Sequence, residues 1–573
     1  MQMNRWIIVV SLLSSIAGGG CYSSEAWDEL RARGTDGGTD TDSGTDSDGD
    51  SDTSATTWPG TTITTGGNSS DSSNSNSNSD SSSNSEPPAP GADGEDVGYD
   101  RAPEISALKI DGNATTITSI KGVHTALIEV VAHDDRALES ITLLLDDKPL
   151  ATLTDPPYTY AWTIDDIAAK QPVELQALAR DNNGQETSVG STISFNLPKG
   201  GTSLWNDDGP PLYTGAVDDL TISPAGSVIA AGSRSLDPEG ALAQAVVRCM
   251  KPLDGQLELD IAYPADDVLD GAYRARAVAV MADGRIAVAG SVVPVNDLSH
   301  SPRPWLATFT PSGATLTVKT FAEFRGVFHD LLIVGQDLVL AGELREDSKL
   351  NAWIASTDDT LDLRWQHTLD LPSNEWATAK TLASAADGSL YLTGTTYDGT
   401  VHRAIAARFS SPQGATTWSR QLPALGEGGD YGEAILVGAS GNLLIGGAVQ
   451  YSHEEPKIMS LRWLYPDNGE SLTDITIPSV GETDQSVSAL TTDHWGRVYV
   501  TGTILRQGTD QDTVVYKRSL DGGASIWKKI HDSGTDGYDR GASIVVDKHG
   551  LVYAAGSRNN DGQPQWWVEG HHP

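Results

Sequence analysis

Few residues of this chain have the types and spacings that catalysis or metal binding requires. The sequence contains no HExxH, GxSxG, P-loop or CxxC motif, and so has none of the short signatures of zinc or serine hydrolases, nucleotide-binding loops or thiol sites. Its twelve histidines are scattered, and a lone pair such as His571 and His572 forms only a weak metal site. Carboxylates are numerous, and a glycosidase-like pair formed in space stays open because no two of them stand out.

Two acidic stretches have residue types that bind calcium. Residues 46–52 alternate aspartates as in an EF-hand loop, whose sixth and twelfth positions should be Gly and Glu. Counted from Asp46, these positions hold Ser51 and Thr57. Residues 181–183, Asp-Asn-Asn, fit a turn better than an ion site. We therefore predict no cofactor, with calcium as the alternative at these stretches.

The first 21 residues have the pattern of an export signal. Arg5 precedes an apolar run at 6–17, which is too short for a permanent membrane span. Three glycines and Cys21 follow, and a cysteine after small residues resembles a bacterial lipobox. The resemblance implies that residues 1–20 are a lipoprotein signal peptide, that Cys21 is lipidated, and that the protein is exported and anchored at the outer membrane or cell surface. Ordinary signal-peptidase cleavage is the alternative.

The formal net charge of −40 excludes several partners. Nucleic-acid binding needs a basic patch, and anionic lipids repel an acidic surface, so the lipid anchor is the one membrane contact we expect. The stretch from Gly34 to Asp100 has twelve Asp, two Glu and no Lys or Arg. Such a composition buries too little apolar surface to fold. We predict that residues 21–101 form a disordered stalk rich in Ser, Thr, Asp and Gly.

Alternation of apolar and polar residues begins after the stalk. Strands are predicted at 126–132, 140–145 and 173–179. The segment 157–162 (PYTYAW) and the strand end 177–181 (ALARD) have the pattern of bacterial immunoglobulin-like domains, which this stretch resembles. The resemblance implies an Ig-like β-sandwich over residues 102–198 that serves as a spacer. We expect Trp162 and Tyr158 to fill its core.

One sequence pattern then recurs seven times: an apolar strand, a turn, a second apolar strand and a closing glycine. The closing glycines, 52 to 58 residues apart, are Gly232, Gly290, Gly342, Gly394, Gly447, Gly502 and Gly556. A third and a fourth strand follow each of the first six, and the fourth often contains Trp. Four strands per repeat predict one blade of a β-propeller, because each blade needs neighbours on both faces until the ring closes. We predict an all-β chain with a seven-bladed β-propeller over residues 200–573.

The predicted ring closes through an N-terminal strand. The last repeat stops after its third strand, at 564–568, and residues 202–206 have the fourth-strand pattern seen around Trp418 and Trp527. We expect the strand around Trp205 to complete blade seven, because this pairing removes an exposed sheet edge.

The repeats resemble bacterial β-propeller repeats of the SBBP type. The D-G-x-h-x-h-x-G phrase of that family is present at 283–290 and 387–394. The resemblance covers nearly all of residues 203–573 and implies a surface protein. The fourth-strand Trp is also similar to that of quinoprotein dehydrogenases, whose eight blades and vicinal disulfide do not match seven repeats and a lone Cys249.

Loops that enter the first strands and loops that follow the closing glycines should share one face of the ring. Aromatic and arginine side chains on that face are our ligand-binding candidates, because such residues dominate binding sites. The candidates are Tyr273, Arg274, Trp376, Tyr431, Tyr538 and Arg540. Packing between blades is the alternative for each of them.

Two classes of function remain. We expect a cell-surface, lipid-anchored binding or adhesion protein whose propeller recognises an extracellular glycan, peptide or protein. The alternative is an extracellular hydrolase or lyase with its site in the propeller funnel. Three convergent carboxylates, or a His–carboxylate pair, at the channel mouth would favour the enzyme. A broad aromatic rim without perturbed carboxylates would favour binding.

Overall fold

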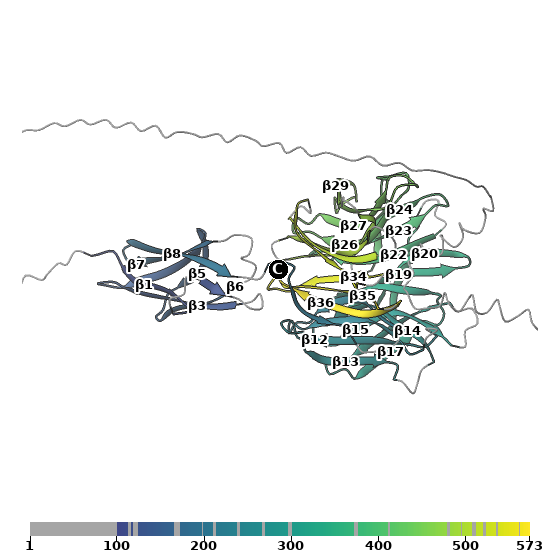
Figure 1. Cartoon of the computed structure of the whole chain (residues 1–573), viewed down its shortest axis with the longest axis horizontal. Helices are drawn as coiled ribbons and strands as arrows, with labels where there is room; N and C mark the ends of the chain where they lie inside the picture. The colour runs from purple at the N-terminus through teal and green to yellow at the C-terminus, as the bar shows by residue number, and fades with distance from the viewer. Residues whose placement is uncertain are drawn as a thin grey trace, which may run out of the picture. The chain divides into compact units, whose positions relative to one another are not determined.

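The structure is a computed structural model and consists of β-strands (Figure 1). It describes residues 100–573 apart from residues 113–115, 119–123, 165–171, 197–198, 210–213, 238–240, 266–269, 296–300, 372–375, 411–412, 478–481, 494–495, 507–510, 520–522, 535–536 and 561. The predicted signal peptide, Cys21 and nearly all of the predicted stalk lie outside the described residues. Every regular element within them is a strand, which confirms the all-β prediction. Among the same residues, no helix has the length and apolarity to cross a bilayer.

Two sheets form a β-sandwich in the part of the chain before residue 199. One sheet has the order β1 (Glu104–Ile110), β3 (His124–His133), β6 (Tyr158–Ile164). The other has the order β2 (Thr116–Thr118), β8 (Glu186–Asn196), β7 (Val173–Asp181), β4 (Leu138–Leu145), β5 (Lys148–Leu153). Alternate residues of β7 are buried, as expected of a strand with one face on a core. Trp162 is buried in this core and Tyr158 packs against it, as predicted.

The other described strands follow one another in units of four antiparallel neighbours. Single parallel pairs, Ala243 with Ala272 and Leu350 with Trp376, join the first unit to the second and the third to the fourth, so that each of these two pairs of units forms one eight-stranded sheet. The first two units are β10 (Thr214–Ile222), β11 (Val228–Ser235), β12 (Ala243–Met250), β13 (Leu257–Tyr263), and β14 (Gly271–Val280), β15 (Ile286–Pro294), β16 (Arg303–Phe309), β17 (Thr315–Thr320). The next two are β18 (Gly326–Val334), β19 (Asp337–Glu346), β20 (Lys349–Thr357), β21 (Leu363–Thr368), and β22 (Trp376–Ser384), β23 (Leu390–Tyr397), β24 (His402–Ser410), β25 (Ala415–Gln421). The fifth and sixth are β26 (Gly429–Val437), β27 (Leu443–Gln450), β28 (Ile458–Leu464), β29 (Ser471–Ile477), and β30 (Glu482–Thr492), β31 (Val498–Arg506), β32 (Gln511–Arg518), β33 (Ser525–His531). The seventh is β34 (Arg540–Val546), β35 (Val552–Asn560), β36 (Gln563–His571) and β9 (Ser203–Asp207).

The units follow one another around a ring. The first strand of each unit contacts the first strand of the next unit, and β34 of the seventh unit contacts β10 of the first. The sheets therefore close into a β-propeller, the architecture in which the first strands surround a central channel.

Strand β9 completes the seventh unit, as predicted. It pairs antiparallel with β36, with Trp205 opposite Gly570. The indole nitrogen of Trp205 donates a hydrogen bond to the carbonyl of Pro252 in the first unit at 2.8 Å. Its ring centroid lies 5.8 Å from that of Tyr553 in the seventh unit. Trp205 thus links the two units that close the ring.

A repeated contact explains the tryptophans of the fourth strands. Each lies over a glycine with positive φ in the turn before the fourth strand of the next unit. The pairs are Trp365 with Gly414, Trp418 with Gly469, Trp527 with Gly201 and Trp205 with Gly255. A Cβ at any of these four glycines would come within 2.5 to 3.1 Å of the indole. The contact therefore requires glycine, both for space and for backbone conformation.

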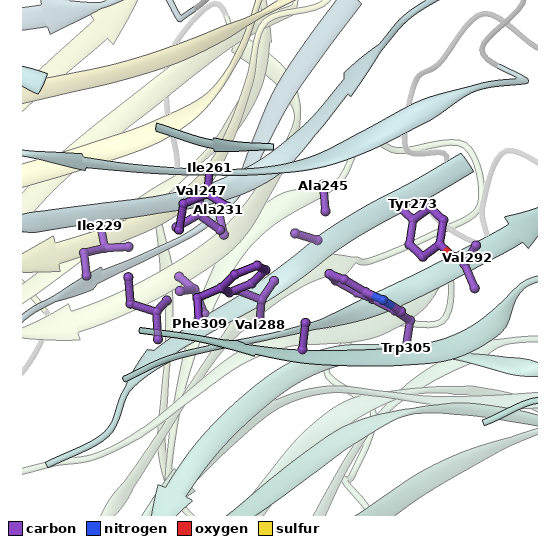
Figure 2. Packing of buried hydrophobic residues seen from close by; sticks show 14 residues of the cluster. Ile229, Ala231, Ala245, Val247, Ile261, Tyr273, Val288, Val292, Trp305 and Phe309 are labelled. Carbon is purple, nitrogen blue, oxygen red and sulfur yellow. The ribbon is translucent and has the colours of Figure 1, made fainter. Parts of the chain in front are cut away.

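Apolar side chains fill the space between neighbouring units. Figure 2 shows the cluster between the first two units, in which Ile229 and Val247 lie with Val288 and Phe309. Trp305 in the same cluster is fully buried. These residues face one another because alternate positions of each strand point to the same side of its sheet.

Candidate functional site

Each first strand carries a β-bulge opposite the closing glycine of its repeat. The register shifts by one residue directly after the residue that pairs with that glycine. A Cβ on any closing glycine would lie 1.8 to 2.0 Å from a carbonyl oxygen of the bulged strand. The repeated glycine is therefore the residue that lets the first strand bulge.

Each bulge adds one residue to the first strand of its unit beyond those that stand in register with the second strand. These residues, which we call the inner belt, are Asp218, Arg276, His329, Lys380, Glu433, Ser488 and Ala542. Belt residues of adjacent units reach one another: Nζ of Lys380 lies 3.6 Å from Oε2 of Glu433. Since the first strands surround the channel of a propeller, the inner belt lies at the channel.

The inner belt carries charges of both signs. Asp218 in the first unit lies 3.5 Å from the Arg540 guanidinium of the seventh unit. His329 lies 3.4 Å from Glu343 on the neighbouring strand β19, measured from Nε2 to Oε2. Burial lowers the pKa of His329. Burial acts to raise the pKa of Glu343, but His329, Lys380 and Arg276 lower it to about 2, so at neutral pH a neutral imidazole faces an ionised carboxylate.

Two buried carboxyl groups next to the belt join the first strands. Asp219 accepts a hydrogen bond from the backbone N–H of Val278 at 2.9 Å and another from the Ser543 hydroxyl at 3.0 Å. Asp330 accepts one from the N–H of Leu382 at 2.6 Å. Burial, with a contribution from Asp330, raises the pKa of Asp219 to about 7. These groups bind strands of different units together, which gives them a structural role.

An aromatic group lies at the strand ends of the fourth and fifth units. Trp376 begins β22 and pairs with Tyr397, which in turn pairs with His402 at the start of β24. The His402 ring lies 5.4 Å from Trp376 and 4.8 Å from Tyr431 of the fifth unit, between centroids. The Lys457 ammonium lies 4.3 Å from the centroid of Tyr431, a cation–π contact. We call Trp376, Tyr397, His402 and Tyr431 the aromatic rim.

The aromatic rim and the inner belt share the same two strands. Lys380 follows Trp376 by four residues in β22, and Glu433 follows Tyr431 by two residues in β26. At roughly 3.3 Å per residue, the belt lies about 7–13 Å farther along the strands than the rim. The Lys380–Glu433 ion pair and the aromatic rim therefore form one candidate site on the fourth and fifth units.

A small cavity borders Tyr431. Its volume is about 10 Å³, and Asp430 and Arg462 are among its lining residues. Asp430 accepts a hydrogen bond from the N–H of Leu425 at 2.7 Å, and Arg462 donates one to Asp474 at 2.8 Å. Among the described residues, the second oxygen of Asp430 and both Nη atoms of Arg462 have no hydrogen-bond partner. This volume suits a single water molecule and is too small for an organic ligand.

Three predicted ligand-binding residues belong to the candidate site or contact its belt. The structure brings Trp376 and Tyr431 together through His402, which lies between their rings. Tyr431 is only 7% exposed, so Trp376 and His402, which are half-buried, are the more accessible members. Arg540 is two units away and contacts the belt through Asp218.

The other three predicted residues lie elsewhere. Tyr273 is 8% exposed and packs 5.7 Å from Trp305 in the cluster between the first two units (Figure 2). Its neighbour Arg274 is half-buried. Tyr538, just before β34, is 69% exposed. The structure does not join these three residues to the aromatic rim.

The sequence analysis did not identify the residues of the inner belt as a group, although their distance from the closing glycines is nearly constant. The belt residue stands fourteen residues before the closing glycine in six repeats and thirteen residues before it in the third. A charged residue at this position interrupts an apolar strand in five of the seven repeats when His329 is counted. The fixed distance to a repeated glycine is the signal that could have located it.

The stretch 181–183 forms a turn. Asp181 Oδ1 accepts hydrogen bonds from the backbone N–H groups of Asn183 and Gln185, at 2.9 and 2.8 Å. This is the side-chain-to-backbone pattern by which aspartate stabilises turns. The other acidic stretch, 46–52, lies outside the described residues.

The fold and the site are those of a β-propeller protein. No protein-family model and no curated protein matches the chain. Similar solved structures include a quinohemoprotein alcohol dehydrogenase from Pseudomonas putida, at 9% identity over 65% of this chain and 76% of that chain, with a TM-score of 0.38. Sqt1 from Chaetomium thermophilum is 13% identical over 65% and 90%, with a TM-score of 0.38. A protein of unknown function from Dyadobacter fermentans is 10% identical over 65% and 97%, with a TM-score of 0.39. No shared function follows from likeness at this level.

Proposed function

We propose that this protein is an exported, lipid-anchored binding protein whose propeller captures extracellular peptide segments at the aromatic rim and inner belt of the fourth and fifth units. The observation that carries the proposal is that the His402 ring lies between Trp376 and Tyr431. These two aromatic residues lie on the same strands, β22 and β26, as the Lys380–Glu433 ion pair. Aromatic side chains next to charged ones are typical of the residues that dominate binding energy.

The mixed charge of the inner belt favours a peptide over a polymer whose charges all have one sign. Arg276 and Lys380 share the belt with Asp218 and Glu433. A polymer with one sign of charge would meet repulsion at half of these positions, and like charges at an interface cost several kcal/mol. A peptide with acidic and basic residues pairs with both signs, and its apolar side chains can pack on the aromatic rim.

Anchoring through Cys21 belongs to the same proposal. A lipid on this cysteine would hold the chain at a membrane. The acidic stretch that follows repels itself and extends, and would carry the folded part away from the surface. Such an arrangement presents a binding site outward, which is what capture of an extracellular ligand requires.

A charge-swapped pair tests the site. In the Lys380→Glu/Glu433→Lys variant the ion pair keeps its members and reverses its polarity. The new carboxylate at position 380 lies near Glu343, whose charge Lys380 stabilises, so the free energy of unfolding should fall while the chain stays folded. Peptides that the wild-type chain selects from a display library should bind this variant about tenfold or more weakly, because each charged contact becomes repulsive. Equal affinity of the two proteins for the selected peptides would rule out this site.

The matched control is a second ion pair on the surface. Lys319 and Asp362 lie 2.7 Å apart on outer parts of the second and third units, away from the rim. Swapping this pair should leave peptide affinity unchanged. A glycan array run in parallel should give no signal, and rim-dependent capture of a glycan would replace the peptide proposal.

The His329–Glu343 pair supports a second candidate function, a hydrolase that acts in the channel. A neutral imidazole next to an ionised carboxylate is an arrangement used for general-base catalysis. Two observations weigh against it. Fixed cations at Arg276 and Lys380 stabilise the charge of Glu343, and burial lowers the pKa of His329, so the base is weak. The test is release of product from a peptide library by the wild type and its loss in His329→Gln.

A further inference from the structure

A second group of polar side chains lies where the ring closes. His531 ends β33 of the sixth unit, while Glu569 and His571 lie in β36, the strand that pairs with β9. The exposed fractions of the three residues are 5%, 4% and 0%. One nitrogen or oxygen atom from each lies within 4.8 Å of those from the other two. The group therefore connects the closing unit to its neighbour.

The hydrogen-bonding capacity of this group is largely unmet. Among the described residues, no hydrogen bond of ordinary geometry reaches Nε2 of His531 or either ring nitrogen of His571, although a backbone group of Gly201 lies next to the His571 ring. Leaving a buried polar atom without a partner costs about 1–3 kcal/mol, and an apolar side chain in the place of His571 would avoid that cost. Two buried imidazoles with free nitrogen atoms beside a carboxylate point to a bound ligand.

The spacing of the group suits a metal ion. Nδ1 of His531 lies 3.1 Å from Oε2 of Glu569, and Nδ1 of His571 lies 3.8 Å from Oε1. Two ligand atoms at the usual 2.0–2.1 Å from a tetrahedral zinc ion are about 3.4 Å apart. The observed distances lie on either side of this value, so a small change of side-chain torsions would place the three donors around one ion.

The carboxylate of Glu569 has different neighbours at its two oxygens. Oε2 lies 3.1 Å from Arg558 and 3.1 Å from Nδ1 of His531. Oε1 lies 3.8 Å from Nδ1 of His571. Each imidazole of the group therefore faces one oxygen of the same carboxylate.

We propose that His531, Glu569 and His571 bind one divalent ion of the zinc class, which ties the seventh unit to the sixth. Two imidazoles and a carboxylate are a donor set that zinc takes, with a water as fourth ligand. The ion connects strands that are about 40 residues apart in the chain. A cross-link of this kind holds a ring at the place where its ends meet.

Metal content is the first test. The full chain, produced without a histidine tag and refolded with one equivalent of zinc chloride, should retain one zinc per chain after gel filtration, measured by mass spectrometry of the metal. The cobalt-loaded protein should show the intense visible bands of a four- or five-coordinate ion. Absence of stoichiometric metal in the wild type under both conditions would overturn the proposal.

Variants separate this site from incidental binding. His571→Leu and Glu569→Gln should each lower zinc retention at least tenfold, whereas His572→Leu, an equally buried neighbour outside the group, should retain the metal. Chelation should lower the melting temperature of the wild type and leave that of His571→Leu unchanged. Equal zinc retention by the wild type, Glu569→Gln and His571→Leu would show adventitious binding only and overturn the proposal, as would a wild-type melting temperature that does not respond to chelation.

Discussion

At the scale of single residues, the closing glycines have the largest effect on the site. Each is required because a Cβ would overlap a carbonyl oxygen of the first strand, and the resulting bulge adds one belt residue per unit. The repeated spacing of the closing glycines predicts the strands on either side of them. It does not predict the belt contacts, since Lys380 and Glu433 are 53 residues apart and meet only when two units pack.

The buried carboxyl group of Asp219 gives a prediction at the same scale. Its pKa rises from 3.8 to about 7 on folding, so between these values the folded chain keeps a proton that the unfolded chain has lost. The free energy of unfolding should therefore fall as pH rises through this range, by roughly 1.4 kcal/mol per pH unit from this group. Asp219→Asn should remove that contribution.

Urea unfolding of both proteins between pH 4 and pH 7 measures this difference. The wild type should lose stability relative to Asp219→Asn as the pH rises. Parallel curves for the two proteins would show that Asp219 has an ordinary pKa in the folded state.

At the scale of elements, fourth-strand tryptophans connect four of the units to the next one. The tryptophans were recognised in the sequence as a feature of the fourth strands, and Trp205 was predicted to lie in the closing strand. The pairing of β9 with β36 confirms the position of Trp205. The partner of each tryptophan could not be predicted, because the turn glycine that it covers belongs to another repeat. The same limit applies to the aromatic rim, where Trp376 and Tyr431 were candidates but His402 between them was not.

Glycine replacements test the tryptophan contact. Gly255→Ala adds a Cβ that would lie 2.6 Å from the Trp205 ring, whereas Gly335→Ala meets nothing within 4 Å at nearly the same φ, 68° against 66°. Both variants carry backbone strain, so the additional loss of stability in Gly255→Ala reports the contact.

Trp205→Ala should cost about 3–5 kcal/mol, and deleting residues 1–210 should lower the melting temperature far more than deleting 1–198. Equal melting temperatures of the two truncated chains would show that β9 does not hold the ring closed.

At the scale of the whole molecule, repetition made the propeller predictable. Seven similar repeats predict a ring because each unit needs neighbours on both faces. The ligand was not predictable in the same way, because the residues at the strand ends change from repeat to repeat. The position eighteen residues before the closing glycine, for example, holds Trp376 in the fourth repeat, Tyr538 in the seventh and Thr214 in the first. The function that we propose therefore depends on residues that the fourth and fifth units add to a common scaffold.

The proposed lipid anchoring also concerns the whole molecule. Metabolic labelling with a fatty acid in a bacterial host should mark the wild-type chain and should not mark Cys21→Ala, because the thiol is the attachment point in a lipobox. Cell fractionation should find the labelled chain with membranes and the variant in the soluble fraction. Equal labelling of both proteins would contradict the anchoring proposal.

The most direct test of the central claim, capture of peptides at the aromatic rim, is one incubation followed by mass spectrometry. The purified chain is mixed with a defined peptide library, and retained and released peptides are both identified. We predict that a subset is retained intact by the wild type, that Trp376→Ala and the Lys380→Glu/Glu433→Lys variant lose this subset, and that both variants still unfold in one cooperative thermal transition. Accumulation of cleaved peptides that depends on His329, or retention that neither variant alters, would contradict the account.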